Sequence, residues 1–360
     1  MNVGTGKSTL VQHLIAALQI PEVDVVYCAY TGKASLVLRS KGCMNAFTLH
    51  KLLYNARYNS RTGTYSFIPK SSLDHAYKII VIDEVSMLSA EMWALLQKHH
   101  AYIIALGDPG QLGPVRATDS SDLLKNPHIF LDEIMRQEEG NEIIKLSMNI
   151  RNGFPLSNFQ GQHVQIINPT DLTEGMLTWA DQIICAKNDT RFHLNGQLRV
   201  LQGKEGDPQI GDKLICLKNS WDTISDIEET PLVNGTIGFI TKVNKVYEPR
   251  LGFDILRIDL ETEVGEVYSN LIVDYKLITQ NVSSLTKADY GRLARNERTK
   301  ALIPKDFAYG YAITAWKSQG SEWDNVLLFE ESFPWEAIEH KRYLYTGVTR
   351  ASSKIVVVRK

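Results

Sequence analysis

Between residues 7 and 150, short apolar runs alternate with longer amphipathic stretches. The runs predict strands at 24–28, 79–82 and 102–106, and the stretches predict helices at 7–18, 33–39, 90–99 and 142–151. The predicted strands are continuously apolar instead of alternating, which is typical of strands covered on both faces. Such an alternation of strands and helices indicates an α/β domain with a parallel sheet.

The pattern breaks between residues 54 and 77. This stretch is polar, with aromatic residues on both sides of a turn that contains Gly63. It therefore predicts a β-hairpin inserted into the α/β domain. Two roles stay open for this hairpin: it packs its own aromatic side chains on the surface, or it stacks them on nucleic-acid bases.

A linker is predicted at residues 154–180, on the basis of Pro155, Gly161 and Pro169. A second α/β unit follows, with its first strand at 182–186 and its last at 355–358.

Residues 203–275 interrupt this second unit with turn residues and strand-like segments. Apolar and polar positions alternate over 253–260 and slip once, at Leu256-Arg257. The interruption predicts a small inserted β-barrel. It is followed by a polar, basic stretch at 276–300, and the α/β pattern resumes near Phe307.

The composition narrows the class of protein. A length of 360 residues allows two domains, and a net charge of −2 gives no overall basic field. A nucleic-acid surface would therefore be a local groove of Lys and Arg side chains. No apolar run approaches the roughly 18 residues of a membrane span, so we expect a cytoplasmic protein without membrane partners. The four cysteines form no C-x-x-C pair and are expected to be reduced core residues.

The first residues match most of a phosphate-binding loop, which runs through Gly4, Thr5, Gly6, Lys7, Ser8 and Thr9. Backbone N–H groups of such a loop surround nucleotide phosphates at a helix N-terminus. Lys7 would supply a cation to the phosphates, and the Ser8 hydroxyl would ligate Mg²⁺. Met1 stands where the full pattern has its first glycine, so we expect either an upstream extension or a fragment.

An acidic pair and a later glycine-rich turn follow two of the predicted strands. Asp83 ends one strand, where it can hold Mg²⁺ through water, and Glu84 is then placed to polarise an attacking water. Gln111, in the turn after the next strand, can sense the γ-phosphate. Taken alone, the acids could also be the start of a helix, and Gln111 could belong to a simple polar turn.

These segments, with others in the same order, resemble the motifs of superfamily 1B DNA helicases of the RecD/Dda type, which are 5′→3′ translocases. The matching segments are 4–9 (motif I), Thr31-Gly32-Lys33-Ala34 (motif Ia), Thr48-Leu49-His50 (a DNA-contact motif), Asp83-Glu84-Val85-Ser86-Met87 (motif II), 107–115 (motif III), Met135-Arg136-Gln137 (motif IV), 314–322 (motif V) and 345–351 (motif VI).

The resemblance implies roles for individual residues. Arg136 and Arg350 would be arginine fingers at the γ-phosphate, although either could instead form a surface ion pair. Gly320 and Glu322 would lie near the nucleotide. The residues expected to touch single-stranded DNA are Thr31, Lys33, Thr48, His50 and Lys317. For His50, packing in the core is the alternative.

The resemblance also implies an architecture of two RecA-like P-loop NTPase domains, 1–165 and 166–360. The hairpin at about 54–77 would be domain 1B, and an SH3-like barrel at about 203–300 would be domain 2B. ATP and Mg²⁺ are the expected cofactors. The expected partners are single-stranded DNA, single-strand/duplex junctions and replication or recombination proteins, with a monomeric protein in a bacterial or phage-infected cell.

Some positions depart from the family pattern, and other functions stay open. Trp316 replaces a common His and would pack in the cleft or stack on DNA, and Gly113 replaces a common Pro in motif III. A superfamily 1 helicase of 3′→5′ polarity or RNA specificity is one alternative, although Ser86 differs from the UvrD-like motif II. The other is a non-catalytic DNA- or partner-binding remnant, because Met1 interrupts the loop pattern.

Overall fold

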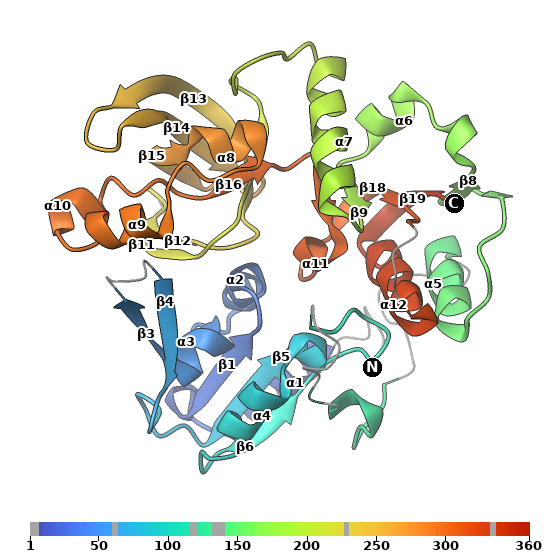
Figure 1. The fold of residues 1–360 in the computed structure, drawn as a ribbon. Helices are drawn as coiled ribbons and strands as arrows, with labels where there is room; N and C mark the ends of the chain where they lie inside the picture. The colour runs from blue at the N-terminus through green and yellow to red at the C-terminus, as the bar shows by residue number, and fades with distance from the viewer. Residues whose placement is uncertain are drawn as a thin grey trace. The chain divides into compact units, whose positions relative to one another are not determined.

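The computed structural model describes residues 7–59, 64–114, 121, 123–131, 141–226, 230–331 and 336–360 (Figure 1). The chain forms two units by its internal contacts. The main unit consists of Met1–Tyr54, Pro69–Asn188 and Ile313–Lys360, and the inserted unit consists of Asn55–Ile68 and Asp189–Ala312. Both sheets that carry the predicted helicase motifs belong to the main unit.

The first sheet of the main unit is parallel, with the strand order β2-β1-β5-β6. Its strands and the surrounding helices are α1 (Lys7–Ala17), β1 (Val25–Ala29), α2 (Gly32–Ser40), β2 (Ala46–Thr48), α3 (Leu49–Leu53), β5 (Ile79–Asp83), α4 (Ala90–Leu96) and β6 (Tyr102–Ala105), with short 3-10 turns η1 (Glu22–Asp24), η2 (Val85–Met87) and η4 (Leu123–Lys125). These bounds confirm the predicted strands and helices of this region to within a few residues.

Both faces of this sheet are covered by helices. Val25 and Tyr27 of β1 join an apolar cluster with Val11 and Ile15 of α1. Val26, which points to the other face, joins a cluster that includes α3 and α4. Because consecutive strand residues face opposite sides, two covered faces explain why the strands are continuously apolar.

The second sheet has the strand order β17-β9-β18-β19-β8-β7. Its strands and helices are α5 (Glu142–Asn152), β7 (Phe159–Gln160), β8 (Val164–Ile167), η5 (Pro169–Asp171), α6 (Glu174–Trp179), β9 (Gln182–Cys185), β17 (Ala312–Thr314), α11 (Ala315–Ser318), β18 (Trp323–Phe329), α12 (Ala337–Val348) and β19 (Ala351–Val358). Strands β9, β18, β19 and β8 pair in parallel, and β7 pairs with β8 antiparallel.

The prediction of a linker at 154–180 is wrong, because this stretch contributes two strands and a helix. Val164, Ile166 and Ile167 of β8 are buried beside β19. The strand is only four residues long and is surrounded by prolines, glycines and polar residues, which hide its short apolar run. The second sheet thus begins well before the strand at Gln182–Cys185.

The inserted unit contains a five-stranded sheet with the order β15-β14-β13-β10-β16. Its elements are β3 (Tyr54–Asn59), β4 (Thr64–Pro69), α7 (Asn188–Leu201), β10 (Lys213–Cys216), β11 (Ser220–Ile224), β12 (Pro231–Leu232), β13 (Ile237–Glu248), β14 (Phe253–Thr262), β15 (Val267–Asp274), α8 (Tyr275–Gln280), α9 (Lys287–Leu293), α10 (Glu297–Lys300) and β16 (Phe307–Tyr309). An isolated bridge pairs Val273 of the edge strand β15 with Lys305, two residues before the other edge strand, β16.

Burial and strand pairing in this unit account for two features of the sequence. Ile255 and Leu256 of β14 are both buried, which explains the slip in alternation that the sequence shows there. Strands β3 and β4 pair as a two-stranded sheet, where the sequence predicts a hairpin.

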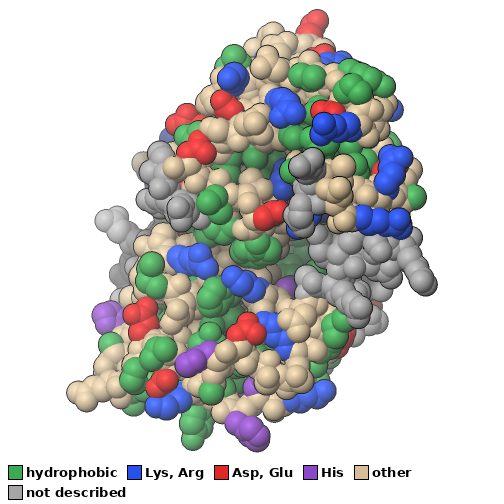
Figure 2. Space-filling view, turned by 90° about the vertical axis from the view of Figure 1, so that its left-hand side faces the viewer, with side chains coloured by type: hydrophobic (Ala, Val, Ile, Leu, Met, Phe, Trp, Pro, Cys, Tyr) green, Lys and Arg blue, Asp and Glu red, His purple; other side chains and the backbone are tan. Residues whose placement is uncertain are grey.

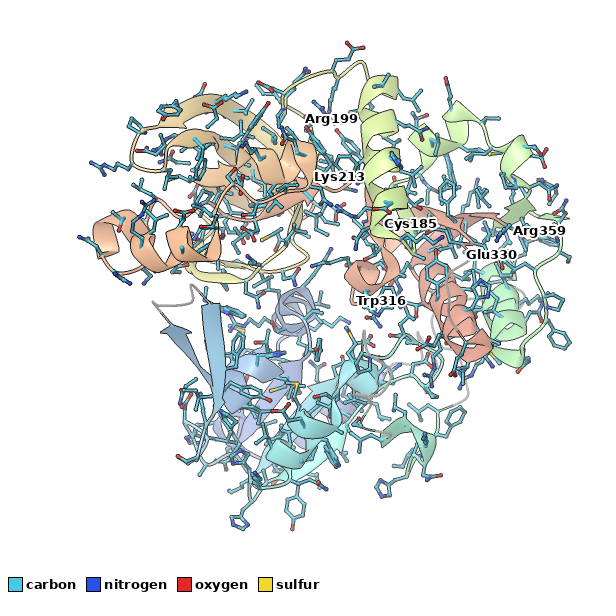
Figure 3. The ribbon with its side chains drawn as sticks, in the orientation of Figure 1. Cys185, Arg199, Lys213, Trp316, Glu330 and Arg359 are labelled. Carbon is cyan, nitrogen blue, oxygen red and sulfur yellow. The ribbon has the colours of Figure 1, made fainter. Side chains whose placement is uncertain are left out.

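A buried ionic network joins α7 to the sheet of the inserted unit. Asp212 is fully buried and accepts hydrogen bonds from Arg199 Nε at 3.1 Å and from the Tyr311 hydroxyl at 2.8 Å. Figure 3 labels Arg199 on α7 and Lys213 at the start of β10. The network fixes the helix to the strand that follows it.

Surface charge and cysteine placement agree with the expectations from composition. On the face in Figure 2, Lys and Arg side chains are interspersed with Asp and Glu, without one continuous basic surface. All four cysteines are buried and free. Among the described residues, every helix is too short or too polar to cross a membrane.

Candidate functional site

The acidic pair lies at the carboxyl end of the first sheet. Asp83 is the last residue of β5, between β1 and β6, and Glu84 follows in the left-handed conformation with φ 55° and ψ 46°. The Glu84 N–H donates to Asp83 Oδ1 at 2.9 Å. A left-handed conformation is costly for a residue with a side chain, and such strain is concentrated at functional sites.

Charged side chains from several motifs affect the pKa of Glu84. Burial raises the pKa of Glu84 above its ordinary value, and the neighbouring Asp83 raises it further. Arg350 and Lys7 act in the opposite direction, and Asp108 adds a smaller upward effect. Charged groups from motifs I, II, III and VI therefore act on one carboxylate, which is a property of catalytic clusters.

Motif III lies beside this carboxylate and is deeply buried. Gln111 is only 2% exposed, and its Oε1 atom has no hydrogen-bond partner among the described residues. The same holds for Ser86 Oγ, Gln319 Oε1 and Ser321 Oγ, which come from motifs II and V. Buried polar atoms without partners are costly, so their presence fits a site that binds a polar ligand.

Arg350 is held in place by the second sheet and its helices. The side chain is 4% exposed. Its guanidinium donates to Thr346 O at 3.0 Å, to Ser321 O at 3.2 Å and to Thr349 Oγ1 at 3.1 Å. The guanidinium is thus oriented by two motifs while its charge acts on Glu84.

The described residues fit a magnesium–nucleotide ligand. Lys7 and Arg350 can neutralise phosphate charge, Gln111 offers an amide, and Asp83 offers a carboxylate for Mg²⁺. Within the described part of the chain there is no cluster of three or more metal-ligating His, Cys, Asp or Glu side chains.

Some of the predicted site residues lie outside the part of the chain that the structure describes. Gly4, Thr5, Gly6 and Arg136 lie outside the described residues, and so does the rest of the motif IV match. The backbone of Ser8 belongs to α1, and Thr9 is exposed on the same helix. Their predicted roles remain expectations.

Two predicted DNA-contact threonines act as helix caps. The Thr31 hydroxyl accepts from the Ala34 N–H at 3.2 Å at the start of α2. Thr48 does the same for the Lys51 N–H at the start of α3, and it is only 2% exposed. Capping explains the residue type at both positions without any ligand.

The other DNA-contact candidates pack against aromatic rings or lie near motif V. His50 lies 5.6 Å from the ring of Tyr30 and 5.8 Å from that of Tyr54, and burial lowers its pKa. Lys33 Nζ lies 5.4 Å from the centre of the Trp323 ring. Lys317 is half-buried on α11, next to the half-buried Trp316 (Figure 3).

Motif V brings its glycine close to motif Ia. Gly320 has φ 78°, and a Cβ atom built there would lie 3.2 Å from the Ala34 Cβ. Both the conformation and the space favour glycine at this position. Glu322, two residues later, is exposed.

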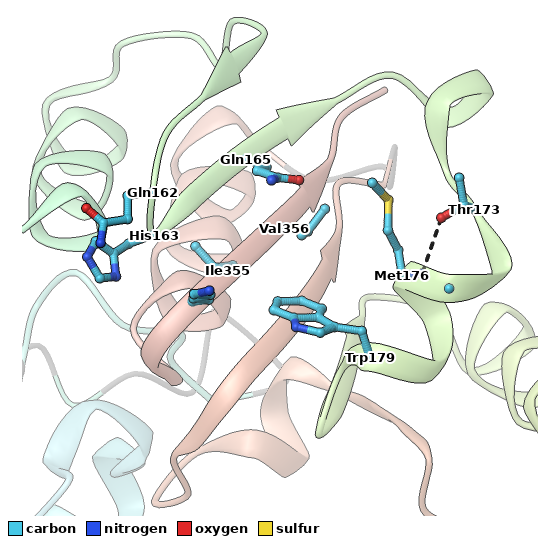
Figure 4. Close-up of a pocket in the computed structure, with 10 residues that line it drawn as sticks. Gln162, His163, Gln165, Thr173, Met176, Trp179, Ile355 and Val356 are labelled. Carbon is cyan, nitrogen blue, oxygen red and sulfur yellow. Dashed lines mark hydrogen bonds between the residues drawn. The ribbon is translucent and has the colours of Figure 1, made fainter.

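A separate pocket of about 360 Å³ lies on the second sheet, away from these motifs (Figure 4). It is lined by residues of β8, β19 and α6, with Trp179 and Met176 on one side and His163 on the other. None of the predicted site residues lines it. The pocket is therefore separate from the residues that the motifs single out.

The sequence analysis missed the residues that join motif III to motif VI. Asp108 Oδ2 accepts from the Tyr345 hydroxyl at 2.6 Å, and Leu112 N donates to Thr346 Oγ1 at 2.9 Å. Gln319 Nε2 adds a bond to Leu112 O at 3.0 Å. These residues stand inside the matched motifs, but nothing in the pattern indicates that they contact one another.

Comparison with known proteins supports the resemblance that the motifs indicate. A family model described as an AAA domain matches residues 2–166, and one described as a UvrD-like helicase C-terminal domain matches residues 309–358. The ATP-dependent RecD2 DNA helicase of Deinococcus radiodurans is 26% identical, over 98% of this chain and 45% of that protein. These matches agree with the resemblance to RecD-type helicases that the motifs indicate.

Two solved helicase structures share the fold of this chain. Pif1 helicase from Candida albicans has a TM-score of 0.56 at 17% identity, covering 99% of this chain and 89% of that one. Pif1 helicase from Bacteroides, in complex with ADP-AlF3 and ssDNA, has a TM-score of 0.57 at 16% identity, covering 99% and 86%. At these identities the likeness shows the shared fold.

A viral protein is more similar over a shorter stretch. The uncharacterized protein R530 of Acanthamoeba polyphaga mimivirus is 35% identical over 37% of this chain and 33% of that protein. The chain thus spans less than half the length of both of these curated relatives. The resemblance to RecD-type helicases that the motifs indicate is confirmed.

Proposed function

We propose that this chain is an ATP-dependent DNA helicase that moves 5′→3′ along single-stranded DNA and couples ATP hydrolysis to duplex unwinding. The observation that carries the proposal is the joint action of Lys7, Arg350 and Asp83 on the Glu84 carboxylate. These groups come from both ends of the chain, and their types match the chemistry of phosphoryl transfer to water. The RecD2 and Pif1 relatives support the same activity.

The proposed chemistry assigns one task to each group. Lys7 and the backbone of the phosphate loop hold the β- and γ-phosphates, and Asp83 with Ser8 would hold Mg²⁺, which neutralises phosphate charge when bound. Glu84 accepts a proton from the attacking water. Gln111 contacts the γ-phosphate, and Arg136 and Arg350 stabilise charge on the transferring group.

The proposed motion depends on Arg350 and Gln111 belonging to different parts of the main unit. Contact of both with the γ-phosphate favours one arrangement of the two sheets, and loss of the γ-phosphate removes that preference. Repeated ATP binding and hydrolysis give directional movement if the affinity of each part for DNA changes in step with these two arrangements. Of the predicted DNA contacts, we assign the grip to Lys33, His50 and Lys317, since Thr31 and Thr48 cap helices α2 and α3.

The proposed domains follow the same scheme. Residues 1–165 and 166–360 would be the two RecA-like domains, with the β3–β4 sheet as domain 1B and the five-stranded sheet as an SH3-like domain 2B. The pairing of β3 with β4, and the bridge between Val273 and Lys305, support this assignment.

An unwinding assay with two substrates tests the proposal. The substrates carry the same duplex with a single-stranded overhang at either the 5′ or the 3′ end. We expect ATP-dependent strand separation from the 5′ overhang and phosphate release that rises when single-stranded DNA is added. Unwinding only from the 3′ overhang would contradict the polarity, and DNA binding without phosphate release would favour the non-catalytic interpretation.

A further inference from the structure

The motif III segment 108–112 is attached at both ends to helix α12. At one end, the fully buried Asp108 carboxylate accepts from the Tyr345 hydroxyl at 2.6 Å and from the Gly110 N–H at 2.9 Å. At the other end, the Leu112 N–H donates to Thr346 Oγ1 at 2.9 Å. Tyr345 and Thr346 are consecutive residues near the end of α12. The segment is therefore fixed to one turn of one helix.

The same turn of helix also holds Arg350. The carbonyl oxygen of Thr346 accepts from Arg350 Nε at 3.0 Å, while the side chain of Thr346 accepts from Leu112. Thr346 is fully buried. Gln111 lies between the two points of attachment, with its Oε1 atom buried and without a hydrogen-bond partner among the described residues. A short path of hydrogen bonds thus connects Gln111 to Arg350.

We propose that Tyr345 is a positioning residue that fixes Gln111 relative to Arg350, so that both groups reach the γ-phosphate together. This inference rests on the proposed ATPase function. A hydrogen bond to an ionised carboxylate is stronger than one between neutral groups, and the surrounding protein excludes water from it. The Tyr345–Asp108 bond therefore holds segment 108–112 more firmly than the backbone bonds alone.

The variant Tyr345→Phe removes this bond with little other change. A Cβ atom built on Gly110 would lie 3.0 Å from Tyr345 Cε1, so the ring packs directly on the Gly110 backbone, and phenylalanine keeps that packing. Arg151 Nη1 lies 3.8 Å from Asp108 Oδ1 and still compensates the buried charge. We therefore expect Tyr345→Phe to fold.

Tyr343 offers a matched control on the same helix. It is fully buried like Tyr345, and its hydroxyl donates to the carbonyl oxygen of Phe329 in β18, not to motif III. Tyr343→Phe thus removes one buried hydroxyl and one hydrogen bond from α12 and leaves segment 108–112 unchanged. Any general effect of such a loss on the fold will be present in both variants.

Steady-state ATP hydrolysis with saturating single-stranded oligothymidylate tests the proposal. We expect Tyr345→Phe to lower kcat by about tenfold and to change KM for ATP by less than about twofold, because the affected contacts form in the transition state. Tyr343→Phe should stay within about twofold of the wild type in both constants. Equal effects of the two variants, or a raised KM with unchanged kcat, would overturn the proposal.

A double-mutant cycle separates positioning from a general structural role. If Tyr345 acts through Gln111, then Tyr345→Phe should have no further effect on kcat in a Gln111→Ala background. A purely structural role predicts that the two losses multiply. Multiplicative losses would therefore overturn the proposal.

Hydrogen exchange gives a readout that does not need ATP hydrolysis. We expect the amides of residues 108–112 to exchange faster in Tyr345→Phe than in both the wild type and Tyr343→Phe. Unchanged exchange would overturn the attachment itself. If the wild type hydrolyses no ATP, the proposed function fails, and the exchange experiment still decides whether Tyr345 holds the segment.

Discussion

Burial and the neighbouring Asp83 raise the pKa of Glu84, and Arg350, which lies beside the second sheet of the main unit, partly offsets that rise. Glu84 follows β5 in the first sheet, and Arg350 lies between α12 and β19 in the second. Because the Arg350 charge acts on the Glu84 carboxylate, residues from both sheets contribute to the same candidate site. The proposed ATPase mechanism depends on this relationship, and the predictions below follow from the contacts around it.

Replacing Arg350 by lysine should nearly abolish catalysis while nucleotide binding persists. Lysine keeps the positive charge but cannot reproduce the three bonds to Thr346, Ser321 and Thr349. We expect DNA-stimulated kcat to fall by at least about 10²-fold, since an arginine finger contributes on the order of 10³–10⁵. Arg342→Lys, on the same helix α12, is the control and should leave kcat near that of the wild type.

Gly320→Ala should destabilise the protein more than the same change at another left-handed glycine. Gly203 has φ 71° with no atom near its Cβ position, whereas at Gly320 the added Cβ would lie 3.2 Å from the Ala34 Cβ. Both variants lose about 1 kcal/mol from the backbone conformation. Thermal unfolding should show a larger decrease in Tm for Gly320→Ala, and equal decreases would show that the contact with motif Ia is unimportant.

Asp212→Ala should strongly destabilise the inserted unit. It leaves the buried Arg199 without its carboxylate partner, which costs about 3–5 kcal/mol of unfolding free energy. Asp254, which is 44% exposed and 3.9 Å from Lys245, is the contrasting case. Asp254→Ala should cost less than about 1 kcal/mol in urea unfolding. A similar loss for both variants would contradict the importance assigned to burial.

Glu142 should make stability depend on pH in the acidic range. The carboxylate of Glu142 accepts hydrogen bonds from three backbone N–H groups, of which that of His163 has the largest effect and those of Gln162 and Val164 smaller ones. These bonds hold the pKa of Glu142 below its ordinary value near 4.5. A lowered pKa in the folded state stabilises the protein above about pH 4.5, and this stabilisation is lost as the pH falls through the folded pKa.

Thermal unfolding of Glu142→Gln at several pH values checks this prediction. The wild type should have a higher Tm than the variant at neutral pH, and the difference should shrink below about pH 4.5. A difference that is constant over the whole range would mean that the Glu142 charge is unimportant to the bonds with β8.

The first sheet could be predicted from the sequence because its signals are local. Continuous apolar runs such as 79–82 predict buried strands, and an acidic pair directly after one of them predicts a site at its carboxyl end. The order of the motifs then indicated the helicase family, which comparison confirms.

The missed features depend on contacts between distant residues or on weak local signals. Strand β8 gives too short a pattern to predict, because only three of its four residues are apolar and Pro169 follows closely. The capping roles of Thr31 and Thr48 require the start of each helix to be known to the residue. The bond between Tyr345 and Asp108 links two motifs whose spacing says nothing about contact.

The most direct test of the catalytic assignment compares two glutamates of the first sheet region. Glu84→Gln removes the proposed proton acceptor, and Glu91→Gln makes the same chemical change at an exposed position on α4. In DNA-stimulated phosphate release, we expect Glu84→Gln to lose about 10²–10⁴-fold in kcat and Glu91→Gln to match the wild type. Wild-type hydrolysis by Glu84→Gln would contradict the account.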